Sequence, residues 1–137
     1  SAAHVFWYAD PSGADEHECS ADQIVTRPLD DEAVCRSNHC LAPEHVEREA
    51  EEPISSSYAR RARMTTRLDS HELDIAAIRA IFASREDGVD SISRWPEDDQ
   101  GSATNACLIT EPATRTLWAC AGPSQRGDWQ QLRFDRG

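Results

Sequence analysis

The sequence contains no lysine, and all 14 of its basic residues are arginine. Without lysine, the chain cannot form a Schiff base or supply a P-loop lysine to a nucleotide phosphate. The 25 acidic residues give a formal net charge of -11, which repels a phosphate backbone. These features exclude two classes of lysine-dependent enzyme and make nucleic acid an unsuitable partner.

The sequence also lacks a long apolar run and a secretion signal. No apolar stretch approaches the roughly 20 residues that a helix needs to cross a bilayer. The first residues show no basic region followed by an apolar core. The five cysteines, an odd number, lie far apart and do not form the pattern of a disulfide-stapled domain. We therefore expect a cytoplasmic protein that makes no membrane contact.

The order of the expected elements predicts the fold class. The 137 residues fit one modest domain or the C-terminal portion of one. Apolar patterns and turn signals predict strands at 3–9, 22–27, 32–36, 104–110, 116–121 and 131–135, helices at 57–68 and 70–86, and an acidic loop or short surface helix at 43–53. Strands, then a central helix pair, then strands predict an α+β fold with a mainly antiparallel sheet.

Residues 111–115 are expected to join two strands as a hairpin. With Ala113 at the centre of this hairpin, Cys107 and Cys120 fall opposite each other. We expect buried free thiols at both positions, because free cysteine commonly packs as a small apolar residue.

The densest group of chemically useful side chains is Ser37-Asn38-His39-Cys40. The NH2 group of an asparagine is a neutral donor that can stabilise an oxyanion, which is worth about 3–4 kcal/mol in acyl transfer. The same residue types also suit a turn, with Asn38 at positive φ and His39 packed in the interior. Residue types alone leave both interpretations open.

Four segments together resemble a known family. They are a strand that opens with Ser1-Ala2-Ala3-His4 and runs to Asp10 and Gly13, the pair Asn38-His39, the helix start Ser56-Ser57-Tyr58-Ala59-Arg60, and Ser91-Ile92-Ser93-Arg94 before a strand pair that ends in Gly122-Pro123. In order and spacing they are similar to the C-terminal half of the acyl-coenzyme A:isopenicillin N acyltransferase-like family of N-terminal-nucleophile hydrolases.

The resemblance implies a four-layer αββα sandwich and cleavage of an amide or thioester in a small acyl-amide or thioester substrate, with no cofactor and no metal. It implies that Asn38 is the oxyanion donor. Ser93 with Arg94 would lie near the substrate or help order the site, and His39 would bind the substrate. Arg94 suits a substrate carboxylate because its guanidinium is a planar fork. The alternative for Arg94 is a surface ion pair with the acidic run Glu97-Asp98-Asp99.

The family's nucleophile is an N-terminal cysteine exposed by autoproteolysis at a glycine-cysteine bond. Neither cysteine before Asn38 fits, because Cys19 lies in a polar turn and Cys35 ends a predicted strand. We expect an upstream segment or subunit of the same enzyme to carry the nucleophile, and we keep Ser1 as a less favoured nucleophile. A sheet that lacks the strands of its upstream segment should expose apolar surface. We therefore expect association with that segment, or self-association.

Two other functions stay open. A truncated homologue could be catalytically inert and act as a binding or interaction module. A small metal-binding domain could use the cysteines and histidines at positions 17, 19, 35, 39, 40 and 45, although Cys35 and Cys40 stand at the loose edge of zinc-ligand spacing and no matching second pair follows.

Overall fold

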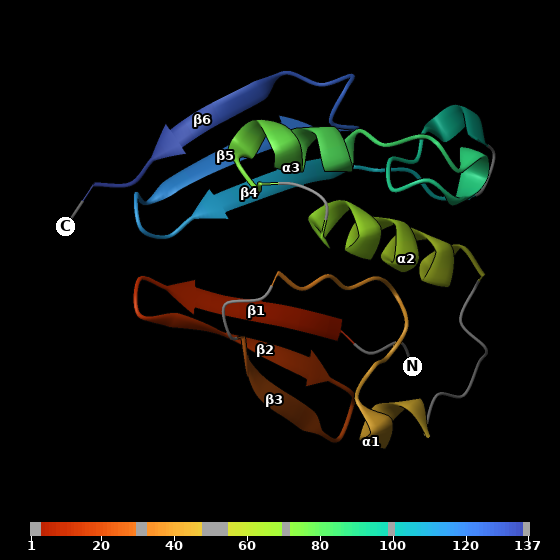
Figure 1. Cartoon of the computed structure of the whole chain (residues 1–137), viewed down its shortest axis with the longest axis vertical. Helices are drawn as coiled ribbons and strands as arrows, with labels where there is room; N and C mark the ends of the chain where they lie inside the picture. Colours follow the sequence, from red (N-terminus) through yellow and green to blue (C-terminus); the bar gives the residue numbers. More distant parts are fainter. Residues whose placement is uncertain (1–3, 30–32, 48–54, 70–71, 99–100, 136–137) are drawn as a thin grey trace.

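The computed structural model describes residues 4–29, 33–47, 55–69, 72–98 and 101–135. These residues form two three-stranded antiparallel sheets, joined by helices (Figure 1). The first sheet contains β1 (His4–Asp10), β2 (Gly13–Cys19) and β3 (Ile24–Leu29), and the second contains β4 (Ala106–Glu111), β5 (Thr116–Ala121) and β6 (Trp129–Arg133). Between them come α1 (Pro43–Val46), α2 (Ser55–Asp69), α3 (Ile75–Phe82) and the 3-10 turns η1 (Gly88–Asp90) and η2 (Pro96–Asp98).

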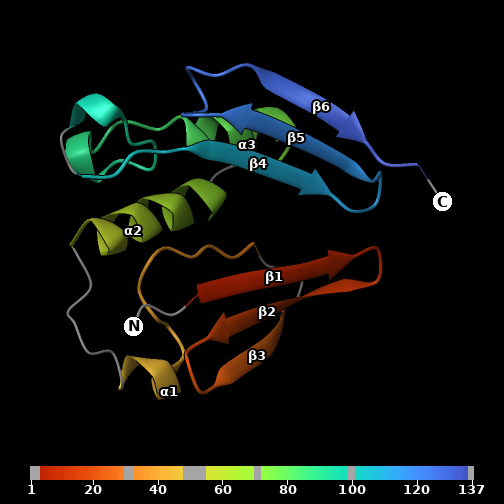
Figure 2. The same cartoon turned by 180° about the vertical axis from the view of Figure 1, so that it is seen from behind.

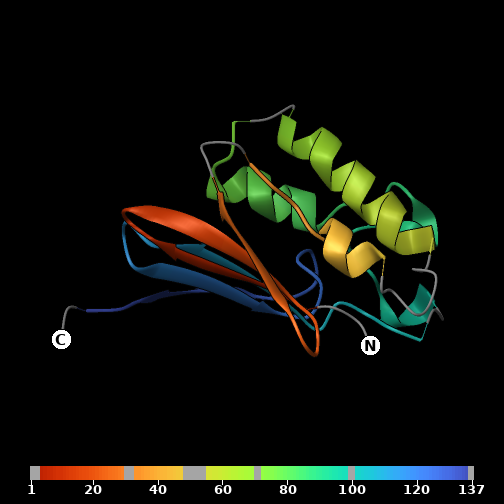
Figure 3. The same cartoon turned by 90° about the horizontal axis from the view of Figure 1, so that it is seen from below.

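The strands make one layer and the helices another. Figure 3 shows both sheets in a single layer, with α2 and α3 on the same side of it. The mixture of helices and antiparallel sheets confirms the α+β class. In Figures 1 and 2, β1 and β4 are the neighbouring edge strands of the two sheets. No helix in the described part of the chain has the length and apolarity to cross a membrane.

The second sheet buries the face that packs toward α3. Side chains alternate along a strand, so Cys107 and Ile109 are buried while Leu108 between them is 60% exposed. Arg79 of α3 stacks on the ring of Trp129 in β6, with its guanidinium carbon 4.6 Å from the ring centroid. The opposite face of this sheet is open and partly apolar.

The first sheet buries two carboxylates on β2, Glu16 and Glu18, each only 2% exposed. Both hold the segment 33–47 against the sheet. Glu16 accepts hydrogen bonds from Trp7 Nε1 at 3.0 Å and from Arg36 Nη2, and it forms an ion pair with Arg27 Nε at 2.8 Å. Glu18 accepts hydrogen bonds from the backbone of Leu41 at 2.9 Å and Ala42 at 3.1 Å and from His45 Nδ1 at 2.9 Å. Because Glu16 is paired with two arginines and Glu18 accepts three hydrogen bonds, burial of these carboxylates is tolerated.

The predicted strand at 32–36 is wrong, because residues 33–36 are irregular. Their recorded polar contacts are made by side chains and not by strand pairing. Arg36 pairs with Glu16, and the thiol of Cys35 lies 3.2 Å from Thr65 Oγ1 in α2. Conversely, the sequence did not predict β2, because Gly13–Cys19 is mostly polar and acidic.

The second predicted helix, 70–86, is too long at both ends. Asp74 caps α3 by accepting a hydrogen bond from the Ala77 backbone at 2.7 Å, so the helix begins at Ile75. It ends at Phe82. In the predicted acidic loop 43–53, α1 spans Pro43–Val46, and 48–53 lie outside the described residues. The other predicted elements lie within two residues of the observed bounds.

Candidate active site around Asn38

The loop that carries Asn38 is pinned to the first turn of α2 by Ser57, whose side chain is fully buried. Ser57 Oγ accepts a hydrogen bond from the Asn38 backbone at 2.9 Å and lies 3.0 Å from Ser37 Oγ. Ser37 Oγ also donates to the Ser57 carbonyl at 2.7 Å. These bonds fix the backbone on both sides of the Asn38 side chain.

His39 strengthens the same attachment. Its Nδ1 atom lies 2.9 Å from Ser57 Oγ and 3.1 Å from Ser37 Oγ. Its ring is buried and stacks on Tyr58, with 4.2 Å between ring centroids. The ring of His39, which was expected to bind the substrate, is therefore held inside the protein, where it helps to fix the Asn38 loop.

Asn38 itself is exposed, and its amide oxygen is already occupied. Arg60 Nη2 donates to Asn38 Oδ1 at 2.8 Å, while Arg60 Nε donates to the Ser56 carbonyl at 3.1 Å. Among the described residues, the NH2 group of Asn38 has no hydrogen-bond partner. It is therefore available to donate to an oxygen of a ligand.

Arg94 lies near Arg60. Burial lowers the pKa of the Arg60 guanidinium, the positive charge of Arg94 lowers it further, and Asp90 opposes this effect. Arg94 Nη1 donates to Ser102 Oγ at 2.9 Å, and its buried Nε atom has no partner within the described part of the chain. The structure therefore brings Asn38 and Arg60 into contact, and Arg94 lies close enough for its charge to act on Arg60.

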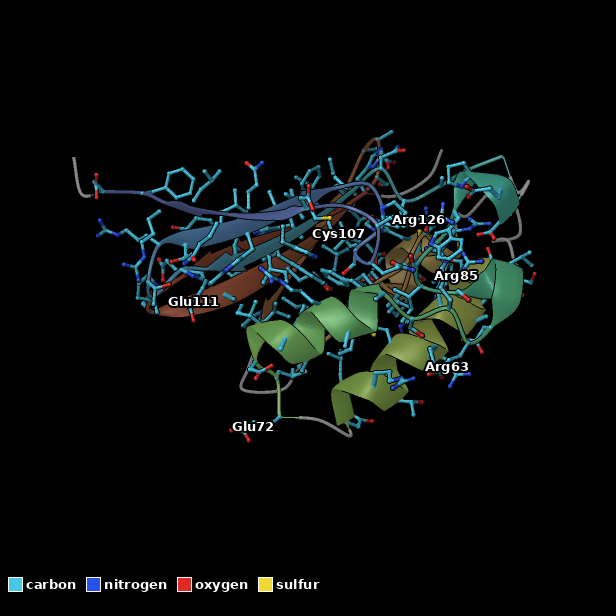
Figure 4. All side chains as sticks on the ribbon, turned by 90° about the horizontal axis from the view of Figure 1, so that it is seen from above. Arg63, Glu72, Arg85, Cys107, Glu111 and Arg126 are labelled. Carbon is cyan, nitrogen blue, oxygen red and sulfur yellow. The ribbon has the colours of Figure 1, made fainter. Side chains whose placement is uncertain are left out.

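The described carboxylates of the acidic run have other arginines as their recorded ion-pair partners, although the positive charge of Arg94 contributes to lowering the pKa of Asp98. Glu97 pairs with Arg126 at 2.9 Å, and Asp98 pairs with Arg85 at 2.7 Å. Figure 4 shows Arg85 and Arg126 close together near the 3-10 turns. Asp99 lies outside the described residues.

Ser93 is fully buried and is directed into the protein. Its Oγ donates to Gln125 Oε1 at 3.0 Å, and its backbone N–H donates to the Ser84 carbonyl at 3.0 Å. These bonds fix the chain immediately before Arg94. Of the two roles expected for Ser93, its surroundings favour ordering the site over touching a substrate.

A cavity of about 230 Å³ adjoins this group. Ser37 and Arg60 line it, together with the apolar side chains of Met64, Phe82 and Leu108. The combination of a cationic group and apolar walls suits a small molecule with a polar and an apolar part.

The cysteines and histidines do not assemble into a metal site. Within the described ranges, no three His, Cys, Asp or Glu residues are placed to hold a metal ion. Instead, His45 binds Glu18. Cys107 and Cys120 are partners in the β4–β5 register, as predicted, and both are buried free thiols. Burial, with Cys120 nearby, raises the pKa of Cys107. Ser1 lies outside the described residues.

The fold and the site together define an α+β protein in which an asparagine, anchored on a helix and bound at its amide oxygen by an arginine, leaves its NH2 group open to a ligand oxygen. Residues 2–126 match the family described as Acyl-coenzyme A:6-aminopenicillanic acid acyl-transferase. The chain belongs to this acyltransferase family, which confirms the resemblance seen in the sequence. No curated protein matches the chain.

Two site residues, and one residue that supports the loop from the first sheet, were given no role from the sequence. Ser57 and Arg60 lie in the helix-start segment of the resemblance, yet nothing in their spacing showed that they bind the Asn38 loop. Glu18 stands in a polar run that resembled a turn. Their contacts join segments that are far apart in the sequence, so local sequence patterns could not predict them.

Proposed function

We propose that this protein is the C-terminal portion of an amidohydrolase or acyltransferase that acts on an amide or thioester, with Asn38 as oxyanion donor. An N-terminal cysteine, carried by an upstream segment of the same enzyme and exposed by autoproteolysis, is the nucleophile. The observation that carries this proposal is the Asn38 amide, whose oxygen is bound by Arg60 and whose NH2 group has no partner among the described residues.

In the proposed reaction, the cysteine sulfur attacks the substrate carbonyl carbon and the carbonyl π electrons move to the oxygen. The NH2 group of Asn38 donates a hydrogen bond to this oxyanion, which supplies about 3–4 kcal/mol. The α-amine of the cysteine takes the thiol proton and passes it to the leaving amine or thiol as the oxyanion re-forms the carbonyl and the substrate C–N or C–S bond breaks. Water or an acceptor amine then attacks the acyl-enzyme thioester, and the cysteine sulfur leaves. Arg94 holds a carboxylate of the substrate.

The exposed faces of the two sheets support a protein partner. Phe6 and Tyr8 of β1 are 61% and 60% exposed, and Leu108 and Leu132 are exposed on the second sheet. A second β layer packed on these side chains would complete an αββα sandwich. A groove of about 970 Å³, lined by residues of both β1 and β4, adds to the surface that a partner could cover.

The test is an activity assay of the enzyme together with its nucleophile-bearing segment, against a panel of acyl-amides and thioesters. We expect Asn38→Ala to lower kcat by about 10²- to 10³-fold. Asn105→Ala is the matched control, because Asn105 is also exposed and only its backbone carbonyl has a recorded role, as the acceptor for Gly122 N. An unchanged kcat in Asn38→Ala would refute the assignment.

The same exposed faces also suit a catalytically inert interaction module. An enzyme preparation that carries a free N-terminal cysteine yet turns over none of the panel would favour this second function. Mass spectrometry of the proteins that co-purify identifies the partner, and a partner beginning at the cysteine of a glycine-cysteine bond would support the enzyme. Ser1→Ala tests the less favoured nucleophile, since it would abolish activity only if Ser1 attacks the substrate.

A further inference from the structure

We propose that Arg60 is a positioning residue that holds the Asn38 side-chain amide with its NH2 group turned toward the reacting carbonyl. This inference rests on the proposed function and extends it. The expected site residues include Asn38 and Arg94, but none of them controls the orientation of the amide.

The geometry makes Arg60 a selective partner. Its guanidinium has only donors, so it can bind the oxygen of an amide but not the NH2 group. A flipped Asn38 would place two donor groups against each other at the 2.8 Å contact with Nη2. The contact therefore selects one of the two amide orientations, and in this orientation the NH2 group points away from Arg60.

Arg60 is itself held at a second point. Its Nε atom donates to the Ser56 carbonyl at 3.1 Å, one turn earlier in α2. Because the guanidinium is planar and rigid, one bond at Nε and one at Nη2 fix the direction from which Asn38 is approached. The Asn38 backbone is fixed separately by Ser57 Oγ at 2.9 Å, so backbone and side chain are anchored on the same helix.

The charge of Arg60 also strengthens the donor. A cation on the amide oxygen draws electron density from the amide nitrogen, and a polarised donor forms a stronger hydrogen bond to an oxyanion. Arginine keeps its proton throughout the usual pH range, so this effect is always present. Lysine would supply the charge at a single point but would lose the two-point attachment.

The first test compares Arg60→Gln and Arg60→Lys with Arg67→Gln, in the enzyme with its nucleophile-bearing segment. Arg67 lies on the same helix and pairs with Glu86, so it is the matched control. We expect both Arg60 variants to lower kcat by about 10- to 100-fold, since a small misplacement of a catalytic group has effects of this size. KM should stay within about threefold, and Arg67→Gln should behave as wild type. Added guanidinium should restore part of the activity of Arg60→Ala.

The second test does not depend on activity. The side-chain 15N–1H resonances of Asn38, assigned by their loss in Asn38→Asp, should be well separated in the wild type. In Arg60→Gln they should move toward the values of a free amide. Resonances that do not change would overturn the proposal.

The two tests separate this inference from the proposed function. If Asn38→Ala lowers kcat but no Arg60 variant does, the positioning role is overturned and the oxyanion donor stands. If Asn38→Ala leaves kcat unchanged, both are overturned, because Arg60 then has no oxyanion donor to orient. Should Arg60→Gln fail to fold, Arg60→Lys and the guanidinium rescue of Arg60→Ala decide the outcome.

Discussion

Replacing Ser57 by alanine should destabilise the protein and disturb Asn38 at the same time. The Ser57 hydroxyl is fully buried and lies within hydrogen-bond distance of Asn38 N, Ser37 Oγ and His39 Nδ1. Two of these groups keep another partner when the hydroxyl is removed. Ser37 Oγ still reaches the Ser57 carbonyl at 2.7 Å, and His39 Nδ1 still lies 3.1 Å from Ser37 Oγ. Among the described contacts, only the Asn38 N–H loses its acceptor.

The size of the effect follows from this count. An unsatisfied buried donor costs about 1–3 kcal/mol, and each of the two weakened contacts about 0.5–1.5 kcal/mol. Asn38 is exposed, so water can reach its N–H and the lower half of the range applies. We therefore expect a loss of about 2–5 kcal/mol in the free energy of unfolding, or roughly 6–20 °C in Tm.

Urea and thermal unfolding, followed by circular dichroism, measure this loss. Ser56→Ala is the matched control, because Ser56 is a neighbouring buried serine whose hydroxyl has no partner among the described residues. Both variants gain the same small benefit in helix propensity. The difference between their free energies of unfolding therefore reports on the hydrogen bonds made by the Ser57 hydroxyl. If Ser57→Ala is no less stable than Ser56→Ala, the network does not hold the loop as described.

Three further outcomes follow from buried groups outside the site. Burial alone would raise the pKa of Glu18, but its hydrogen bonds lower it, so Glu18→Gln should cost about 2–4 kcal/mol at pH 7. This difference from wild type should shrink as the pH falls below about 4.3, where the unfolded state takes up its proton first; a pH-independent difference in urea unfolding would contradict this. Gly127→Ala should lower stability by about 1–3 kcal/mol, measured by thermal unfolding, because its Cβ would collide with the Ala121 carbonyl and Cys120 Sγ; an unchanged Tm would argue against this packing. Cys107 and Cys120 should resist iodoacetamide at pH 8 until urea is added, as judged by intact mass; rapid labelling of the native protein would show that they are accessible.

Some of the molecule could be predicted from local sequence, because local rules decide it. The β4–β5 hairpin has strand formers on both sides of a short turn, so the pairing of Cys107 with Cys120 followed from counting outward from the turn. The same holds for α2, whose start at a run of serines could be placed within two residues. In both cases, the information lies within about 15 neighbouring residues.

Strand β2 shows why other parts could not be predicted. Its sequence Gly-Ala-Asp-Glu-His-Glu-Cys has the composition of a solvated turn, since carboxylates are seldom buried. Glu16 is buried because Arg36, 20 residues later, neutralises it, and Glu18 is buried because His45, 27 residues later, binds it. Long-range pairing overrides local composition here, and the same contact replaces the strand predicted at 32–36 by an irregular segment.

The segment 33–47 gains a role from these pairings that its composition does not indicate. On one side it is bound to the first sheet through Glu16 and Glu18, and on the other it is bound to α2 through Ser57 and Arg60. Asn38 therefore lies on a connection between the strand layer and the helix layer, and its position depends on both attachments. A change that weakens either attachment should therefore shift the position of Asn38. Glu18→Gln should accordingly alter the Asn38 side-chain resonances even though Glu18 makes no recorded contact with that residue. Glu44→Gln, at an exposed position in the first turn of α1, should leave them unchanged.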